Sequence, residues 1–257
     1  MGAMRRDAPA RVVVVGLASC FGCQLQMTNI ERHLLDVLGQ VDLRYWQLTS
    51  SDPMPEEFDV AVVEGAVTTE EAAQTLRRVR AAADAVIAIG ACAVTGGIPA
   101  MAAPGFEGRA HGVYGAEAPA ACGELRAPAP VSSVIAVDHE VRCCPIDPLD
   151  FVDTLQRVLR GSNKAVPTST LCGECKRNER GCFYGRETLC LGLVTRAGCG
   201  ARCPDLGRPC NGCAGLSPDA NVASARAVAA RSGVDPARLD KALELFNTVD
   251  PSLASKG

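Results

Sequence analysis

The stretch LCGECKRNERGCFYGRETLCLGLVTRAGCGARCPDLGRPCNGCA, residues Leu171–Ala214, decides how this chain must fold. It contains eight cysteines and two CxxC pairs, and glycine, proline, arginine and asparagine fill most of the gaps. This composition predicts neither helix nor strand, and a loop of this length cannot bury much apolar surface of its own. Bound metal commonly supplies the missing folding free energy, because the ligand bonds form only in the folded state. Eight thiolates suit two four-cysteine sites, which hold either zinc or iron–sulfur clusters.

The composition of the whole chain favours metal sites over disulfides. The 257 residues are 47 % apolar, which is enough for one sizeable core. The net charge of −3, the lack of a basic run and an aromatic content of 4 % argue against nucleic acid and anionic membranes as partners. Arg5 and Arg6 precede only a short apolar run, so we expect no signal peptide, no membrane span and a cytoplasmic location. Fourteen cysteines in that compartment predict metal binding.

Strands and helices alternate in the chain before the cysteine loop. The β-branched run RVVVVG, residues 11–16, predicts a buried parallel strand that stops at glycine. Further strands are predicted at 41–47, 59–65, 85–90 and within 131–138, and helices at 24–38, 69–82 and 148–160. This alternation predicts an α/β fold with a doubly wound parallel sheet. We expect this domain to span residues 1–161, followed over 162–257 by a mostly irregular metal-binding domain that ends in two short helices, 221–231 and 236–246.

Chemically useful side chains follow the ends of four predicted strands. They are Cys20, Cys23, Glu64, Cys92 and Cys144. Because the carboxyl ends of parallel strands meet at one edge of an open sheet, where ligands bind, we expect these residues to converge. Four rim cysteines and eight loop cysteines make twelve, or three four-ligand sites, and leave Cys122 and Cys143 over. We choose Cys144 over Cys143 because Pro145 follows it, as proline follows a ligand in bacterial ferredoxins.

Each group has an alternative interpretation. The rim cysteines can be buried structural thiols, since free cysteine packs as a small hydrophobe. The pairs CGEC and CNGC can form an ordinary four-cysteine zinc site, although Cys182, Cys190, Cys199 and Cys203 would then need a second zinc ion. Glu64 can be a solvated residue or a helix cap at the end of its strand.

The chain resembles the small, electron-transferring subunit of [NiFe] hydrogenases. The matching motifs are SCFGC with Cys20 and Cys23, VVEGAV with Glu64, GACAVTGG with Cys92, CCPID with Cys144, and the eight-cysteine loop that ends in PCNGC. Together they span about residues 11–215 in the order of the family. Their number and order make the resemblance far more specific than any single CxxC pair.

The resemblance implies a flavodoxin-like first domain and three [4Fe–4S] clusters. The proximal cluster would be held by Cys20, Cys23, Cys92 and Cys144, with Glu64 nearby; the distal cluster by Cys172, Cys175, Cys182 and Cys190; and the medial cluster by Cys199, Cys203, Cys210 and Cys213. Cys172 stands where many relatives have a histidine. Cys203 is a fourth thiolate where many relatives have three and hold [3Fe–4S].

The implied function is that of an electron relay with no active site and no catalytic residues of its own. The partners would be a nickel-binding large subunit and an acceptor subunit that contains flavin or iron–sulfur clusters. Within the family, the chain is similar to the cytosolic, cofactor-linked branch. Two other functions remain: a cluster-carrying subunit related to that of respiratory complex I, and a zinc-stabilised scaffold or hydrogen-sensing regulator without catalytic flux.

Overall fold

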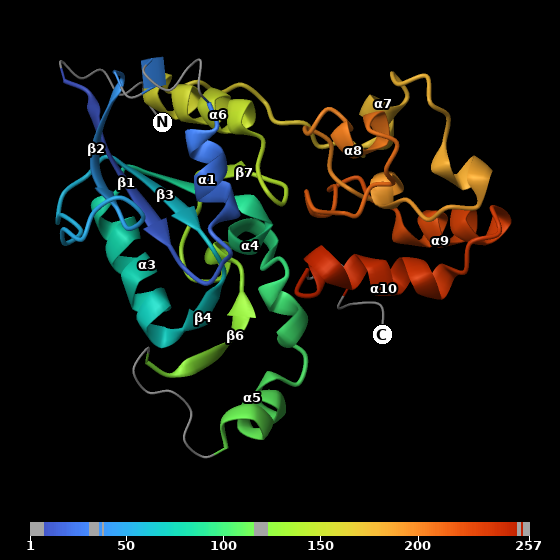
Figure 1. The fold of residues 1–257 in the computed structure, drawn as a ribbon, viewed down its shortest axis with the longest axis horizontal. Helices are drawn as coiled ribbons and strands as arrows, with labels where there is room; N and C mark the ends of the chain where they lie inside the picture. Colours follow the sequence, from blue (N-terminus) through green and yellow to red (C-terminus); the bar gives the residue numbers. More distant parts are fainter. Residues whose placement is uncertain (1–7, 31–35, 38, 116–122, 251–252, 254–257) are drawn as a thin grey trace. The chain divides into compact units, whose positions relative to one another are not determined.

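The computed structural model describes residues 8–30, 36–37, 39–115, 123–250 and 253. The chain divides into two compact units, Met1–Lys164 and Ala165–Gly257 (Figure 1). The sequence led us to expect the boundary between residues 161 and 162, directly after the helix predicted at 148–160. Among the described residues, no helix combines the length and the apolar character that crossing a membrane requires.

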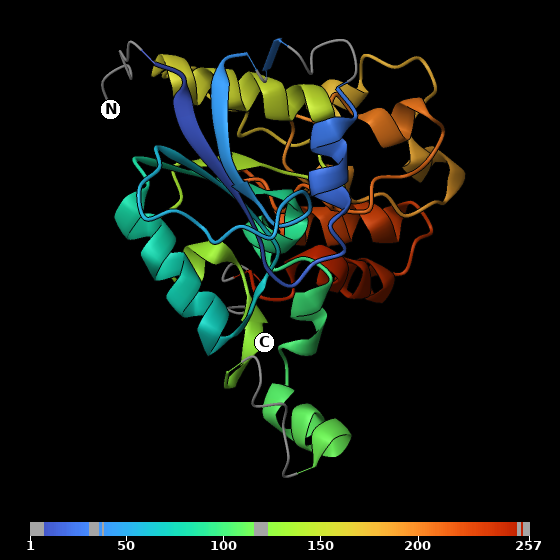
Figure 2. The ribbon, with the colours of Figure 1, turned by 60° about the vertical axis from the view of Figure 1, so that its left-hand side comes forward.

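A five-stranded parallel sheet forms the centre of the first unit, as the sequence predicts (Figures 1 and 2). Its strand order is β2-β1-β3-β5-β7, and every neighbouring pair is parallel. The strands are β1 (Ala10–Gly16), β2 (Val41–Trp46), β3 (Val60–Glu64), β5 (Ala85–Ile89) and β7 (His139–Val141). The order reverses at β1, which places a switch point at the carboxyl edge between β1 and β3.

Helices cover both faces of this sheet. Successive side chains of β1 point to opposite faces, so Val12 and Val14 enter one core and Val13 and Val15 the other. The first core packs against α1 (Gly22–Thr28) and α6 (Pro148–Arg160), and the second against α3 (Glu70–Ala82) and α4 (Gly90–Thr95). Burial on both faces explains why β1 is an unbroken apolar run. The predicted doubly wound α/β fold is therefore confirmed.

The strand predicted within 131–138 is wrong. Residues Val131–Ser133 form a 3-10 turn, η3, and the fifth strand of the sheet is β7, which begins after it. The hydroxyl of Ser133 donates to the carbonyl of Pro130 at 2.6 Å, a local hydrogen bond that favours a turn over an extended ladder. The apolar residues of this segment are nevertheless buried, because Val131 and Ile135 join the second core.

The helix predicted over 24–38 is shorter among the described residues. Helix α1 ends at Thr28, whose hydroxyl donates to the carbonyl of Leu25 at 2.7 Å. Asn29 then closes a tighter turn through its N–H to the carbonyl of Gln26. Such local bonds compete with helix continuation. Residues 31–35 and 38 of the predicted helix lie outside the described residues.

Several short elements have no strong sequence signal. A two-stranded antiparallel sheet joins β4 (Val67–Thr69) to β6 (Leu125–Ala129). The chain between β5 and β6 contains α4, the 3-10 turn η1 (Pro99–Ala102) and α5 (Phe106–Tyr114). Helix α5 has no buried residue, and it projects away from the sheet in both views (Figures 1 and 2).

The second unit consists of the cysteine loop and two helices that pack against it. Within the loop there are only short turns: α7 (Cys172–Cys175), η4 (Phe183–Arg186), η5 (Leu191–Leu193) and α8 (Arg202–Asp205). Helices α9 (Val222–Arg231) and α10 (Pro236–Asn247) follow, close to the predicted bounds. Leu239 and Leu243 of α10 share one core with Leu171 and Leu191 of the loop, so the tail helices cover the loop.

Candidate functional site

The structure places the predicted rim residues at the carboxyl edge of the parallel sheet. Cys20 lies in the turn after β1, and Cys23 lies in α1, directly beyond it. Glu64 is the last residue of β3 and is 1 % exposed. Cys92 lies in α4, which begins where β5 ends, and Cys144 follows β7. Strands far apart in sequence therefore bring these side chains to one edge.

Two contacts fix the position of Cys23. Its backbone N–H donates to Glu64 Oε1 at 3.0 Å, across a buried contact. Its sulfur lies against Gly90, which has a φ of +80°, and a Cβ built on Gly90 would be 2.4 Å from Cys23 Sγ. Only glycine accommodates both that backbone conformation and that sulfur.

The four rim thiols influence one another electrostatically. Burial raises the pKa of Cys92 to about 11, and repulsion from Cys144, Cys20 and Glu64 adds to the rise. Burial also raises the pKa of Cys23, with further contributions from Glu64 and Cys144. Cys144 thus acts electrostatically on both Cys23 and Cys92, and Cys20 acts on Cys92.

The neighbouring cysteines 143 and 144 have different surroundings. The carbonyl of Cys143 accepts a hydrogen bond from Ala91 N at 2.8 Å, and its backbone has a φ of 90°. The thiol of Cys144 raises the pKa values of both Cys23 and Cys92. The choice of Cys144 over Cys143 as a ligand stays a prediction. Cys122 lies outside the described residues.

A second group of thiols occupies the first half of the loop. Cys172 and Cys175 begin and end α7, and burial raises the pKa of Cys172 to about 11, with added repulsion from Cys190, Cys175 and Cys182. A Cβ on Gly192 would lie 3.6 Å from the sulfurs of both Cys172 and Cys190. Gly192 therefore lies beside both of these thiols.

A third group occupies the second half of the loop. Burial raises the pKa of Cys210 to about 12, and repulsion from Cys190 and Cys213 adds to it. Burial also raises the pKa of Cys203, and repulsion from Cys213 and Cys199 adds smaller increases. Cys190 borders this group as well, because the backbone N–H of Cys210 donates to Cys190 Sγ at 3.2 Å.

Several residues near the sulfurs were missed by the sequence reasoning. Asn178 Nδ2 donates to Cys175 Sγ at 3.6 Å, and the backbone N–H of Gly212 donates to Cys210 Sγ at 3.4 Å. Cys210 Sγ donates to Thr195 Oγ1 at 3.4 Å, and Thr195 is 2 % exposed. Of these residues, only Gly212 could have been found from the sequence. It lies inside the CxxC pair CNGC, and the tight turn of such a pair directs backbone N–H groups towards the cysteine sulfurs.

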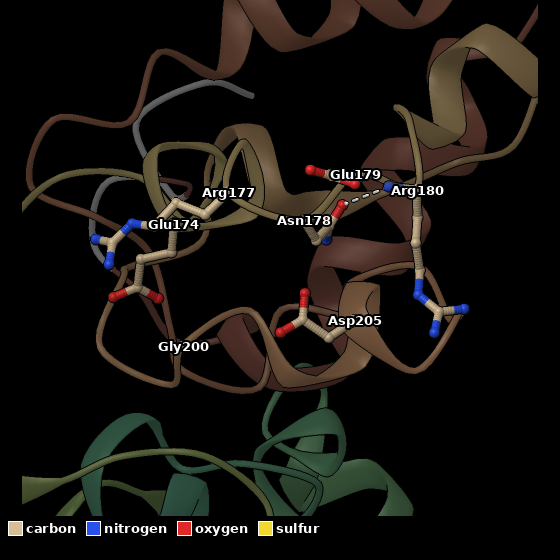
Figure 3. Close-up of a pocket in the computed structure, with 7 residues that line it drawn as sticks. All are labelled: Glu174, Arg177, Asn178, Glu179, Arg180, Gly200 and Asp205. Carbon is tan, nitrogen blue, oxygen red and sulfur yellow. Dashed lines mark hydrogen bonds between the residues drawn. The ribbon is translucent and has the colours of Figure 1, made fainter.

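A polar cavity of about 570 Å³ lies between the two halves of the loop (Figure 3). It is lined by Glu174, Arg177, Asn178, Glu179, Arg180, Gly200 and Asp205. Asp205 of α8 points into it opposite Asn178, while the N–H of Arg180 donates to Asn178 Oδ1 at 3.3 Å (Figure 3). The carboxylate of Glu174 receives the N–H of Gly198 at 2.9 Å, which ties the turn after Cys172 to the segment before Cys199.

The donor set fits iron–sulfur clusters. A nearby positive centre, such as a bound metal, would favour ionisation of the buried thiols whose pKa is raised. They are Cys23, Cys92, Cys172, Cys190, Cys203 and Cys210. Amide N–H groups directed at sulfur are the contacts that tune such clusters. Among the described residues, no three or more His, Cys, Asp or Glu side chains are grouped so that they could hold one metal ion.

Comparison with known proteins identifies the family. The family model "NADH ubiquinone oxidoreductase, 20 Kd subunit" matches residues 20–158, within the first unit. A subunit of the vhu F420-non-reducing hydrogenase of Methanocaldococcus jannaschii is 30% identical over 88% of this chain and 90% of its own. The delta subunit of sulfhydrogenase 2 of Pyrococcus furiosus is 33% identical over 81% of this chain and 87% of its own.

Among solved structures, a chain of an NAD+-reducing [NiFe]-hydrogenase in the H2-reduced state is similar, with a TM-score of 0.52 and 28% identity. The match covers 62% of this chain and 96% of that one. The rim cysteines fall within the residues that the family model matches, and the cysteine loop lies beyond them. The chain therefore belongs to the family of the NADH ubiquinone oxidoreductase 20 kDa subunit and, within it, to the small subunits of hydrogenases.

Proposed function

We propose that this chain relays electrons in a [NiFe] hydrogenase through three [4Fe–4S] clusters. Two observations support the proposal: thiols distant in sequence lie at one edge of the sheet, and others gather in the loop, where repulsion from neighbouring cysteines raises the pKa of buried thiols. Cys190 acts on thiols in both halves of the loop. We assign the twelve thiols to three sets of four. The proximal set is Cys20, Cys23, Cys92 and Cys144; the distal set is Cys172, Cys175, Cys182 and Cys190; and the medial set is Cys199, Cys203, Cys210 and Cys213.

Clusters of this kind accept and release single electrons, and their potentials depend on hydrogen bonds, burial and charge. The residues of this chain supply those influences. The N–H of Gly212 and the amide of Asn178 donate to sulfur, which disperses negative charge and favours reduction. The carboxylate of Glu64 beside Cys23 acts in the opposite direction. The chain thus sets potentials and spacing and contributes no catalytic residue.

The proximal set also marks the surface for the large subunit, which would bind nickel. Three large exposed apolar side chains follow rim cysteines closely in sequence: Leu25 at 57% after Cys23, and Ile98 at 45% and Met101 at 43% after Cys92. Ile98 is adjacent to the site, since its backbone hydrogen-bonds the thiol of Cys92. Exposed apolar groups of this size commonly mark a protein interface. Electrons would pass between nickel and the proximal cluster here, and would reach a flavin- or iron–sulfur-containing acceptor subunit at the other end, in the cytoplasm.

Metal and sulfide analysis of the purified protein tests the proposal. We expect about twelve irons and about twelve acid-labile sulfides per chain, from four of each per cluster. A Cys23→Ser variant should lose about four irons and a Cys175→Ser variant a different four, which EPR of the reduced protein distinguishes. Zinc in the loop in place of iron would identify the scaffold alternative and refute the relay.

A second measurement tests the partner surface. Hydrogen exchange of the complex with the large subunit should protect the segments around Leu25 and Ile98 relative to the isolated chain. Protection at the opposite, amino-terminal edge of the sheet, with none at Ile98, would refute the proposed orientation.

A further inference from the structure

A chain of three hydrogen bonds leads from strand β2 to the rim cysteines. Trp46 Nε1 donates to Gln24 Oε1 at 2.6 Å, and Gln24 Nε2 donates to Glu64 Oε2 at 2.8 Å. Glu64 Oε1 accepts the backbone N–H of Cys23 at 3.0 Å. Gln24 is 0% exposed and Glu64 is 1% exposed, so water does not compete for these contacts. The three side chains come from β2, α1 and β3.

The chemistry of the donors fixes the direction of the whole chain. An indole N–H can only donate, so the atom of Gln24 that faces Trp46 must be the amide oxygen. The amide NH₂ of Gln24 must then face Glu64, which removes the usual ambiguity between the two ends of the amide. Both oxygens of Glu64 therefore accept from N–H donors. This is the arrangement that suits an ionised carboxylate.

We infer that Gln24 and Trp46 are positioning residues that hold the charge of Glu64 against the proximal cluster and so set its reduction potential. The inference rests on the proposed proximal cluster at Cys20, Cys23, Cys92 and Cys144. The charge of Glu64 makes addition of an electron to its neighbour less favourable, and the N–H dipole of Gln24 offsets part of that charge. The hydrogen bond from Trp46 keeps the NH₂ group of Gln24 directed at Glu64.

Glu64 and Gln24 are in contact, yet this arrangement predicts that their substitutions shift the proximal reduction potential in opposite directions. Glu64→Gln removes a negative charge next to Cys23 and should raise the proximal potential. Gln24→Met keeps the volume but removes the dipole that offsets that charge, so it should lower the potential. A purely structural role would loosen the site in both variants and shift the potential in the same direction. Trp46→Phe removes the indole N–H together with part of the ring volume, and it should act in the direction of Gln24→Met with a smaller magnitude.

The test is a redox titration of the complete hydrogenase complex, followed by EPR of the proximal cluster. We expect each single variant to change the equilibrium constant for one-electron reduction at least twofold, which corresponds to about 18 mV, since tenfold is about 59 mV. The distal and medial potentials should stay unchanged. Tyr45→Phe is the matched control, because Tyr45 neighbours Trp46 on β2, packs on the opposite face of the sheet and also loses one polar hydrogen.

A double variant makes the test independent of small folding effects. In the Glu64→Gln background the charge is gone, so adding Gln24→Met should no longer lower the proximal potential. Shifts of equal sign for the two single variants, or an equal effect of Gln24→Met in both backgrounds, would overturn the inference. If the wild-type complex shows no proximal cluster signal that depends on Cys23, the proposed function has failed instead, which the same spectra reveal.

Discussion

Gly90→Ala probes the packing around the proximal set most directly. A Cβ at this position would lie 2.4 Å from Cys23 Sγ, whereas ordinary contacts begin at 3.4 Å. The sulfur must therefore move by about 1 Å, while metal–ligand distances hold within about 0.2 Å. The φ of +80° adds a backbone cost of about 1–2 kcal/mol for a residue with a side chain. We expect the variant to fold with reduced stability and to lose the proximal cluster.

Gly105→Ala separates the two effects. Gly105 has a similar φ of +65°, but a Cβ there meets no atom within 4 Å. It should therefore carry the backbone cost of about 1–2 kcal/mol without any loss of metal. The assay is iron and sulfide content with EPR, alongside thermal unfolding. Gly90→Ala should lose about four of about twelve irons and Gly105→Ala none. An unaltered proximal signal in Gly90→Ala would refute the packing argument.

Three further predictions concern other parts of the chain. Cys203→Ala should leave Cys199, Cys210 and Cys213 with a three-iron cluster, seen as a new EPR signal in the oxidised protein; an unchanged spectrum would show that Cys203 is no ligand. Removal of iron by a chelator should expose residues 165–215 to protease before residues 1–164, because the core of the second unit includes the cysteines themselves; earlier cleavage in the first unit would contradict this. Burial lowers the pKa of His139 below its ordinary value of about 6.5, although Asp138 opposes the shift. The unfolded chain therefore binds more protons there, so the melting temperature should fall as the pH drops through about 6.5, and His139→Gln should flatten that dependence.

The sequence predicts best where local signals agree. Helix α6 spans 148–160 as expected because Pro148 occupies its first turn and Asp147 Oδ1 accepts the N–H of Leu149 at 2.9 Å. Gly161, with a φ of 62°, ends it in a left-handed conformation. Strand β1 is equally clear, since burial on both faces requires an unbroken apolar run. The convergence of Cys20, Cys23 and Cys92 then follows from the topology of a parallel sheet.

What the sequence leaves out is non-local. Strands β4 and β6 pair across more than fifty residues of chain, and neither is long enough to show a period of two. The apolar segment that begins at Val131 is buried without joining the sheet. A short apolar run indicates that residues are buried, but it does not by itself show that they form a strand. Trp46 and Gln24 are 22 residues apart, and Gln24 and Glu64 are 40 apart. No spacing rule connects them, although a glutamine on the apolar face of a helix next to a cysteine is a local hint.

The two units hold their cysteines by different means, and this difference has a chemical consequence. In the first unit a hydrogen-bonded sheet with two cores of its own delivers the thiols to one edge, and Glu64, Gln24 and Gly90 fix them there. In the second unit Cys190 and Cys210 are part of the core, and helices α9 and α10 complete it. We therefore expect the first arrangement to form before metal binds, so that single side chains can tune the potential of a cluster held there. We expect the second to depend on bound metal for its shape, so that its cysteines determine stability as much as potential.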